Sequence, residues 1–183
     1  NYITEKNQEA LLPDLHVQTK LDILELDLCN RLVMPAFVDL HFHMRNPGQE
    51  HKETLISANK AAIKGGYTDL LGMANTNPVI DNKTLITEII EKNNSLGMTR
   101  LLQVSAVTKG LNGKALVDFE ENRKATRFFS DDGKNIDDEQ IMREALLASK
   151  QHDFKILDHS EEETEMVIRN LDLVRKTGGN LHF

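Results

Sequence analysis

The stretch at residues 32 to 44 reads LVMPAFVDLHFHM, an apolar run that ends in two histidines. In an extended chain, successive side chains point to opposite faces, so every second residue lies on the same side. We therefore expect His41 and His43 to converge, while Leu40 and Phe42 point outward and pack against helices. This stretch predicts a strand whose last residues carry polar, reactive side chains.

From residue 33 onward, short apolar runs alternate with segments of helical period. The predicted strands cover residues 32 to 44, 67 to 73, 99 to 107, 127 to 130, 154 to 159 and 180 to 183. The predicted helices cover residues 52 to 64, 84 to 93, 116 to 124, a segment capped by Asp137 or Asp138, and residues 163 to 176. Such an alternation is typical of βα units.

Five strand–helix units and the start of a sixth indicate an α/β fold, an incomplete (β/α)₈ TIM-type barrel of about five to six βα units. A complete barrel typically needs about 250 residues, and an open α/β sheet is the alternative. Residues 32 to 183 form the predicted partial barrel. Residues 1 to 31 are assigned to a small N-terminal β appendage, because a strand pattern runs through Leu21, Ile23, Leu26 and Leu28.

The composition restricts the class of protein. The 183 residues are 39% hydrophobic, which suffices for one domain with a buried core. The single cysteine, Cys29, fits a reducing compartment, and we expect a cytoplasmic protein. A net charge of −7 argues against a nucleic-acid partner, and no apolar run approaches the roughly 18 residues of a membrane-spanning helix.

Two imidazoles at the carboxyl end of a barrel strand can hold one divalent metal ion. Asp39 is expected to point inward with His41 and His43 and to orient one of them as an outer partner. The alternative without a metal is a pair of hydrogen-bonded polar side chains at a strand end. Because His-x-His is a short pattern that arises by chance, its surroundings have to decide between the two.

Five segments in order along the chain carry further information. They read VMPAFVDLHFHMRNPGQEHKET at residues 33 to 54, KGGYT at 64 to 68, MANTNP at 73 to 78, FSDDG at 129 to 133 and HSE at 159 to 161. Together they resemble the dihydroorotases, which are cyclic amidohydrolases of the amidohydrolase superfamily. The chain resembles the N-terminal part of such an enzyme.

The resemblance implies a metal centre with one or two zinc ions. His41 and His43 would bind one metal ion, and Asp132 would join them as a ligand in the catalytic centre, in the place that a carboxylated lysine fills in related amidohydrolases. His159 matches the metal-binding histidine at the end of the fifth barrel strand. Asp131 is the less suitable ligand of the Asp-Asp pair. Taken alone, Asp-Asp-Gly is more often a turn, and a single strand-end histidine is usually an ordinary one.

The resemblance also implies a site for the substrate's carboxylate, held by Arg45 and Asn75. The planar fork of donors on arginine suits this task. As alternatives, Arg45 would form a salt bridge at the rim, and Asn75 would shape the turn before Pro78. The resemblance does not assign His182 to the metal, because the family's next metal-binding histidine would fall just beyond Phe183.

The activity implied is that of a hydrolase on cyclic amides. It is the zinc-dependent, reversible cyclisation of N-carbamoyl-L-aspartate to L-dihydroorotate in pyrimidine biosynthesis. The family places its general base on the last barrel strand, so we expect the chain as written to lack it. The resemblance further implies a homodimer and association with aspartate transcarbamoylase.

The sequence departs from the family pattern in several places. Ala36 replaces a glycine, Ala74 replaces a proline, and Glu161 runs almost directly into the next helix, where a longer loop is usual. Another cyclic amidohydrolase, of allantoinase or hydantoinase type, therefore stays open. So do a non-catalytic dihydroorotase-like scaffold that binds aspartate transcarbamoylase, and an unrelated α/β domain.

Overall fold

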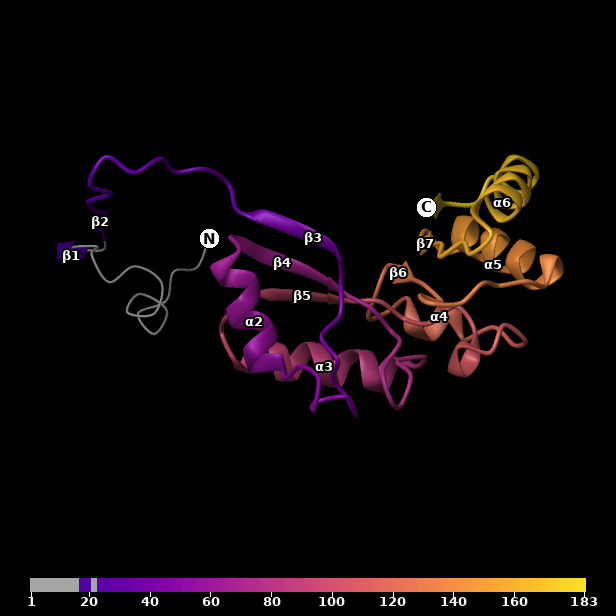
Figure 1. Cartoon of the computed structure of the whole chain (residues 1–183), viewed down its shortest axis with the longest axis horizontal. Helices are drawn as coiled ribbons and strands as arrows, with labels where there is room; N and C mark the ends of the chain where they lie inside the picture. The colour runs from indigo at the N-terminus through magenta and orange to yellow at the C-terminus, as the bar shows by residue number, and fades with distance from the viewer. Residues whose placement is uncertain (1–16, 21–22) are drawn as a thin grey trace.

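The computed structural model describes residues 17 to 20 and 23 to 183. Its barrel strands are β3 (Phe37–Phe42), β4 (Tyr67–Gly72), β5 (Arg100–Gln103), β6 (Phe128–Phe129), β7 (Lys155–Leu157) and β8 (Leu181–His182). Two sheets, ordered β3-β4-β5 and β6-β7-β8, contain only parallel pairs. Figure 1 shows β3, β4 and β5 side by side.

A single parallel bridge joins the two sheets. Ser105, just after β5, pairs with Phe129 of β6. The Ser105 N–H donates to the Phe128 carbonyl (3.0 Å), and the Ser130 N–H donates to the Ser105 carbonyl (2.8 Å). The strands therefore follow one another in chain order, each beside the next, as in the wall of a barrel.

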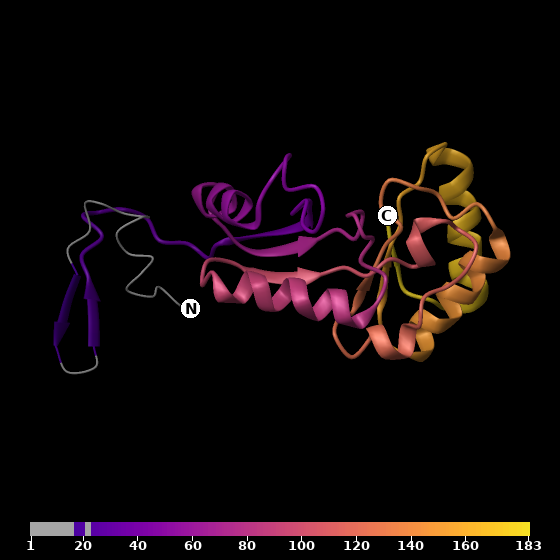
Figure 2. The ribbon, with the colours of Figure 1, turned by 90° about the horizontal axis from the view of Figure 1, so that it is seen from below.

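A helical segment follows most of the strands. The helices are α2 (Leu55–Lys64), α3 (Lys83–Ser95), α4 (Phe119–Asn122), α5 (Glu139–Gln151) and α6 (Glu163–Thr177), with a 3-10 turn at Lys109–Leu111. Side chains of Thr54, Asn82 and Asp138 cap α2, α3 and α5, which satisfies backbone N–H groups that a helix leaves free. In Figure 2, α5 and α6 lie together at the C-terminal end. The predicted fold class, an incomplete (β/α)₈ barrel, is confirmed.

Alternation along the strands creates two apolar layers. Leu70 and Leu101 face the helices, in a large core that also contains Phe129 and Phe154. Leu71 faces the opposite side, in a smaller cluster with Met73 and Val104. This second layer lines the inside of the curved sheet, so both faces of β4 and β5 are covered, as expected for parallel sheets.

A β-bulge interrupts the alternation in β3. Asp39 pairs with Leu70 and Phe42 pairs with Gly72, so three steps along β3 match two along β4. Phe42 packs outward against the large core, as predicted. Leu40 does not: it lines a cavity on the inner face of the sheet. The prediction for Leu40 is wrong because the extra residue of the bulge breaks the strict period of two.

The first barrel strand is shorter than predicted. It begins at Phe37 and not at residue 32, and Leu32 is 91% exposed. Pro35 lacks a backbone N–H to donate to a neighbouring strand, which opposes a strand through this segment.

Before the barrel, β1 (Val17–Lys20) pairs antiparallel with β2 (Ile23–Leu26). This hairpin includes Ile23 and Leu26 of the predicted strand pattern, whereas Leu21 lies outside the described residues. The boundary of the appendage near residue 31 stays a prediction. Among the helices described, none is long and apolar enough to cross a membrane.

Candidate metal centre

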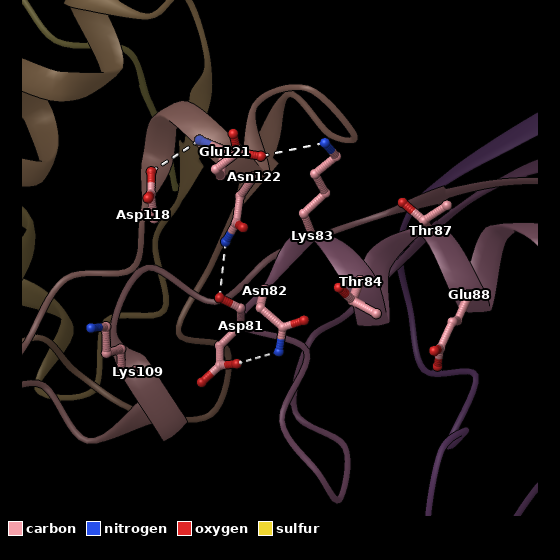
Figure 3. Close-up of a pocket in the computed structure, with 10 residues that line it drawn as sticks. All are labelled: Asp81, Asn82, Lys83, Thr84, Thr87, Glu88, Lys109, Asp118, Glu121 and Asn122. Carbon is pink, nitrogen blue, oxygen red and sulfur yellow. Dashed lines mark hydrogen bonds and ion pairs between the residues drawn. The ribbon is translucent and has the colours of Figure 1, made fainter.

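A surface groove of about 690 Å³ lies between the starts of α3 and α4 (Figure 3). Several of its charged groups have protein partners. Lys83 contacts Glu121 (3.3 Å), and the Asp81 carboxylate accepts the Gly110 N–H (3.0 Å). None of the ten residues that line it is a histidine or a cysteine. The groove lacks the side chains that the sequence analysis singled out.

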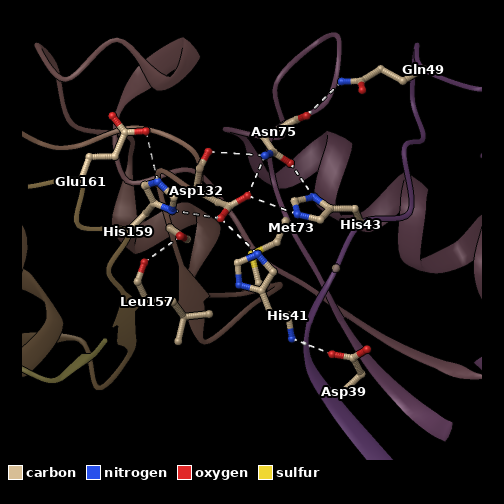
Figure 4. A network of polar contacts seen from close by, with 12 residues as sticks. Asp39, His41, His43, Gln49, Met73, Asn75, Asp132, Leu157, His159 and Glu161 are labelled. Atoms are coloured by element: carbon tan, nitrogen blue, oxygen red, sulfur yellow. Dashed lines mark hydrogen bonds and ion pairs between the residues drawn. The ribbon is translucent and has the colours of Figure 1, made fainter. Parts of the chain in front are cut away.

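Those side chains gather around the buried carboxylate of Asp132 (Figure 4). Its Oδ1 lies 3.1 Å from His41 Nε2 and 3.8 Å from His159 Nδ1, and its Oδ2 lies 3.6 Å from His43 Nε2. The structure therefore brings together all four predicted metal ligands.

The fold explains this convergence. His41 lies near the carboxyl end of β3 and His43 just beyond it, while Asp132 and His159 follow β6 and β7. Parallel strands end at the same rim of a barrel, and barrel enzymes react at that rim. The rings of His41 and His43 lie edge to face, with centroids 5.2 Å apart.

Asn75, which follows β4, connects two members of the cluster. Its Nδ2 donates to Asp132 Oδ2 (2.7 Å), and its Oδ1 accepts from His43 Nδ1 (3.1 Å). The second contact leaves His43 Nε2 free of its proton and directed at Asp132. Ligand histidines in metal sites commonly donate their other ring N–H in this way.

The donor atoms fit a divalent metal ion. The ligand atoms of His41, His43 and Asp132 all lie within 4.8 Å of one another. Donors about 2.0–2.1 Å from a tetrahedral zinc ion lie roughly 3.3 Å apart, and the two shorter separations here, 3.1 and 3.6 Å, bracket that value. Burial lowers the pKa of His43, although the charge of Asp132 opposes the shift. A lower pKa favours the neutral imidazole, the form that binds metals.

Sequence reasoning missed Glu161 as a neighbour of the cluster. Its carboxylate lies 3.7 Å from His159 Nε2, on the ring edge away from Asp132. Asn135 holds the Glu161 backbone by accepting its N–H (2.7 Å) and donating to its carbonyl (3.3 Å). The spacing of two residues from His159 was the only signal in the sequence, since the partner Asn135 lies 26 positions away.

Asp39 lies elsewhere than predicted. It pairs with Leu70, whose side chain faces the helices, and its Oδ1 accepts the backbone N–H of His41 (3.0 Å). Figure 4 shows this contact below the cluster. Asp39 thus supports the main chain of His41 and does not orient a histidine ring, because the bulge between Asp39 and Phe42 breaks the alternation that would place them on one face.

Asp131 is directed away from the histidines. Its Oδ1 accepts the N–H groups of Val107 (2.8 Å) and Thr108 (3.0 Å), and its Oδ2 contacts the Thr108 hydroxyl. Burial raises the pKa of Asp131, and these three contacts oppose the increase. The placement agrees with the prediction that Asp131 is the less suitable ligand.

Arg45 and Asn75 lie on neighbouring loops. Gln49, in the loop of Arg45, donates from Nε2 to the Asn75 carbonyl (3.0 Å). The Arg45 charge acts on His43, whose pKa it helps to lower. Within the described chain, no hydrogen bond or ion pair of the Arg45 guanidinium is found, so the alternative of a salt bridge at the rim is not formed there.

A small cavity of about 110 Å³ lies beside the cluster and is lined by His41, Asp132, His159 and His182, among others. His182 projects from β8 into the same cavity but is not one of the three residues with grouped ligand atoms. This placement leaves the prediction for His182 unchanged.

Comparison with known proteins adds to this geometry. The model of the dihydro-orotase-like family matches residues 30–181. A dihydroorotase of Aquifex aeolicus is 40% identical over 139 residues, which are 75% of this chain and 33% of that protein. A dihydroorotase of Clostridium botulinum is 31% identical over 189 aligned positions, covering 96% of this chain and 48% of that protein. The chain thus spans about a third to a half of the length of these curated relatives.

A solved structure, the L-hydantoinase (dihydropyrimidinase) of Arthrobacter aurescens, superposes with a TM-score of 0.62 at 15% identity. The match covers 87% of this chain and 46% of that one, and it supports the barrel fold. The family match runs through every strand from β3 into β8 and includes all the residues of the histidine cluster. From this match we conclude that the chain belongs to the dihydro-orotase-like family.

Proposed function

We propose that the chain forms the metal-binding part of a dihydroorotase, which interconverts N-carbamoyl-L-aspartate and L-dihydroorotate. The observation that carries the proposal is the cluster of His41, His43 and His159 around the buried carboxylate of Asp132. It lies at the rim where barrel enzymes bind substrate. Dihydroorotases among the relatives support the choice of substrate.

We further propose zinc, one or two ions, as the metal. Nitrogen and carboxylate donors in this arrangement suit zinc. A bound zinc ion would lower the pKa of a water molecule to about 7 and polarise the amide carbonyl. Asn75 supports the centre by holding His43 and Asp132 in place.

Arg45 is proposed to bind the substrate's carboxylate. Its positive charge lies near His43, and its guanidinium has no partner among the described residues. A paired arginine would first have to give up its protein partner, whereas this one is available for a two-pronged contact. Asn75 is proposed to contribute a second contact, next to the ligands that it already touches.

Ring closure and opening also require a proton transfer to or from the amide nitrogen. The resemblance places the general base on the last strand of an eight-stranded barrel, outside β3 to β8. A homodimer, association with aspartate transcarbamoylase, a role in pyrimidine biosynthesis and a cytoplasmic location stay predictions.

The test combines metal analysis with ring-opening assays on dihydroorotate, hydantoin and allantoin, made on a barrel that carries β3 to β8 together with the strand that supplies the general base. We expect bound zinc, faster opening of dihydroorotate than of the other two rings, and loss of both properties in His41→Ala. His51→Ala is the matched control, because His51 is exposed and lies outside the cluster. Preference for hydantoin or allantoin would contradict the substrate assignment. Zinc binding without any ring opening would favour the scaffold.

A further inference from the structure

Two aspartates that the proposed function does not use stand directly before two of the proposed ligands. Asp131 precedes Asp132, and Asp158 precedes His159. Asp131 is 4% exposed, and three donors from the segment after β5 surround its carboxylate. A buried carboxylate is costly unless it is fully hydrogen-bonded, so this arrangement fixes the Asp131 backbone firmly.

Asp158 is held from a different direction. Its Oδ2 accepts from the hydroxyl of Ser160 (2.8 Å) and from Nδ2 of Asn170 (2.6 Å). Asn170 belongs to α6 and is 1% exposed, and its Oδ1 accepts from the Nε of Arg169 (2.9 Å). The end of β7 is thereby tied to a helix that packs on the outside of the barrel.

The same helix reaches the segment that follows Asp132. The guanidinium of Arg169 donates to the carbonyls of Ile136 and Asp137, at 2.8 Å each. The adjacent Asn170 holds Asp158. Neighbouring residues of α6 thus fix both the segment after one proposed ligand and the residue before another.

The direction of a side chain depends on its backbone. At a strand end, consecutive side chains point to opposite sides, so anchoring one side chain sets the direction of the next. Metal ligands must be held within about 0.5 Å of the productive geometry. An aspartate that is anchored by partners outside the cluster can do this for the ligand that follows it.

We propose that Asp131 and Asp158 are positioning residues of the metal centre, which direct Asp132 and His159 toward the metal by anchoring the residue before each. This inference rests on the proposed function, because it assumes that the cluster binds a metal. The arrangement occurs twice with unrelated partners, backbone amides and a threonine for Asp131, and a serine and an asparagine for Asp158.

The experiment measures zinc affinity by competition with a chelator, in the full chain, for Asp131→Asn and Asp158→Asn. In each variant an NH₂ group replaces an acceptor oxygen and faces existing donors, while the size of the side chain is kept. Thr108→Val is a milder variant, which removes one donor to Asp131 and covers the case that Asp131→Asn does not fold.

Asp138→Asn is the matched control. Asp138 also accepts two backbone N–H groups, from Gln140 (2.8 Å) and Ile141 (3.2 Å), but it caps α5 and does not adjoin a ligand. It undergoes the same chemical change away from the ligands, so it shows what an Asp→Asn exchange elsewhere in the fold does to zinc affinity. Urea unfolding of each protein without metal measures the loss of stability.

We expect Asp131→Asn and Asp158→Asn to weaken zinc binding by roughly 10- to 100-fold, the range found for outer partners of metal ligands. The visible absorption bands of the cobalt-substituted protein should shift in both variants and stay unchanged in Asp138→Asn. Wild-type zinc affinity and cobalt spectra in both variants would overturn the positioning role and leave the metal centre intact. A wild-type chain that binds no zinc would overturn the proposed function itself, and this inference with it.

Discussion

Asn75 is proposed to serve both the metal ligands and the substrate. Its amide contacts His43 and Asp132 with both ends, yet the proposed function also gives it a part in holding the substrate. An amide has two donors and two acceptor lone pairs, so one lone pair stays available after these contacts, and Nδ2 makes only a long second contact, 3.5 Å to the Asp132 carbonyl. Asn75 can therefore keep the ligands in place while it contacts a carboxylate, provided that the substrate replaces this long contact to the Asp132 carbonyl.

Without metal, protonation of His43 is expected to destabilise the fold. Burial lowers its pKa in the folded protein, whereas the unfolded chain titrates near the ordinary value of about 6.5. The unfolded state then binds more protons, so this contribution to stability is present above pH ~6.5 and is lost as the pH falls through that value toward the folded pKa. Urea unfolding at several pH values, with His43→Gln for comparison, measures the effect.

We expect the free energy of unfolding to decrease more between pH ~7.5 and ~5.5 in the wild type than in His43→Gln. His51→Gln, at an exposed position, should behave as the wild type. Equal pH dependence in the wild type and His43→Gln would show that the burial of this ring has no measurable energetic effect.

At the scale of elements, periodicity predicted every barrel strand and every α-helix from β3 onward. It worked because each element buries one face, which imposes a period of two or 3.6 on its apolar residues. The ends of the strands were less predictable. The bulge at Leu40 and the late start of β3 at Phe37 depend on how β4 pairs with β3. That pairing cannot be read from the sequence of β3 itself.

The candidate site likewise has residues that the sequence could predict and residues that it could not. His41, His43, Asp132 and His159 could be predicted because they follow strands in chain order, and strand ends meet at one rim. The hydrogen-bond partners of these residues could not be predicted. Asp131 binds groups 23 and 24 positions away, so only the folded chain shows that it is an anchor. The same is true of Asp39, whose face is set by the bulge.

Two loops of the rim are packed so closely that they require a glycine at position 48. A Cβ placed on Gly48 would lie 1.7 Å from the Asn77 carbonyl oxygen, and the φ of Gly48 is +80°. We predict that Gly48→Ala lowers the free energy of unfolding by about 2–3 kcal/mol, since it combines a backbone clash with left-handed strain. Urea denaturation measures the loss.

Gly110→Ala is the matched control for strain alone. Its φ is +62°, and an added Cβ there would meet nothing within 4 Å. It should cost only about 1–2 kcal/mol. If the two variants lose equal stability, the contact between the Gly48 and Asn77 backbones has no energetic importance.

At the scale of the whole molecule, the described strands differ in how well their neighbours protect them from solvent. β4 and β5 have strand neighbours on both sides, whereas β3 pairs only with β4, and its Val38 and Leu40 are 54% and 59% exposed. Exposed hydrogen bonds and few covering contacts lower the free energy of local opening.

We therefore expect backbone amides of β4 to exchange with deuterium at least about tenfold more slowly than those of β3, equivalent to ~1.4 kcal/mol in opening free energy. Mass spectrometry of peptides that cover residues 67 to 72 and 37 to 42 makes the comparison. Equal protection of the two strands would mean that β3 has a partner on its free side in solution.

The order of the strands also bears on synthesis. From β3 to β8, each strand pairs with the one made just before it, so no strand has to wait for a distant segment before it can add to the sheet. A chain leaving the ribosome at about 5–20 residues per second can extend this wall one unit at a time. At each stage, however, the edge of the newest strand has unpaired backbone groups, and the nascent chain is most likely to pair incorrectly there.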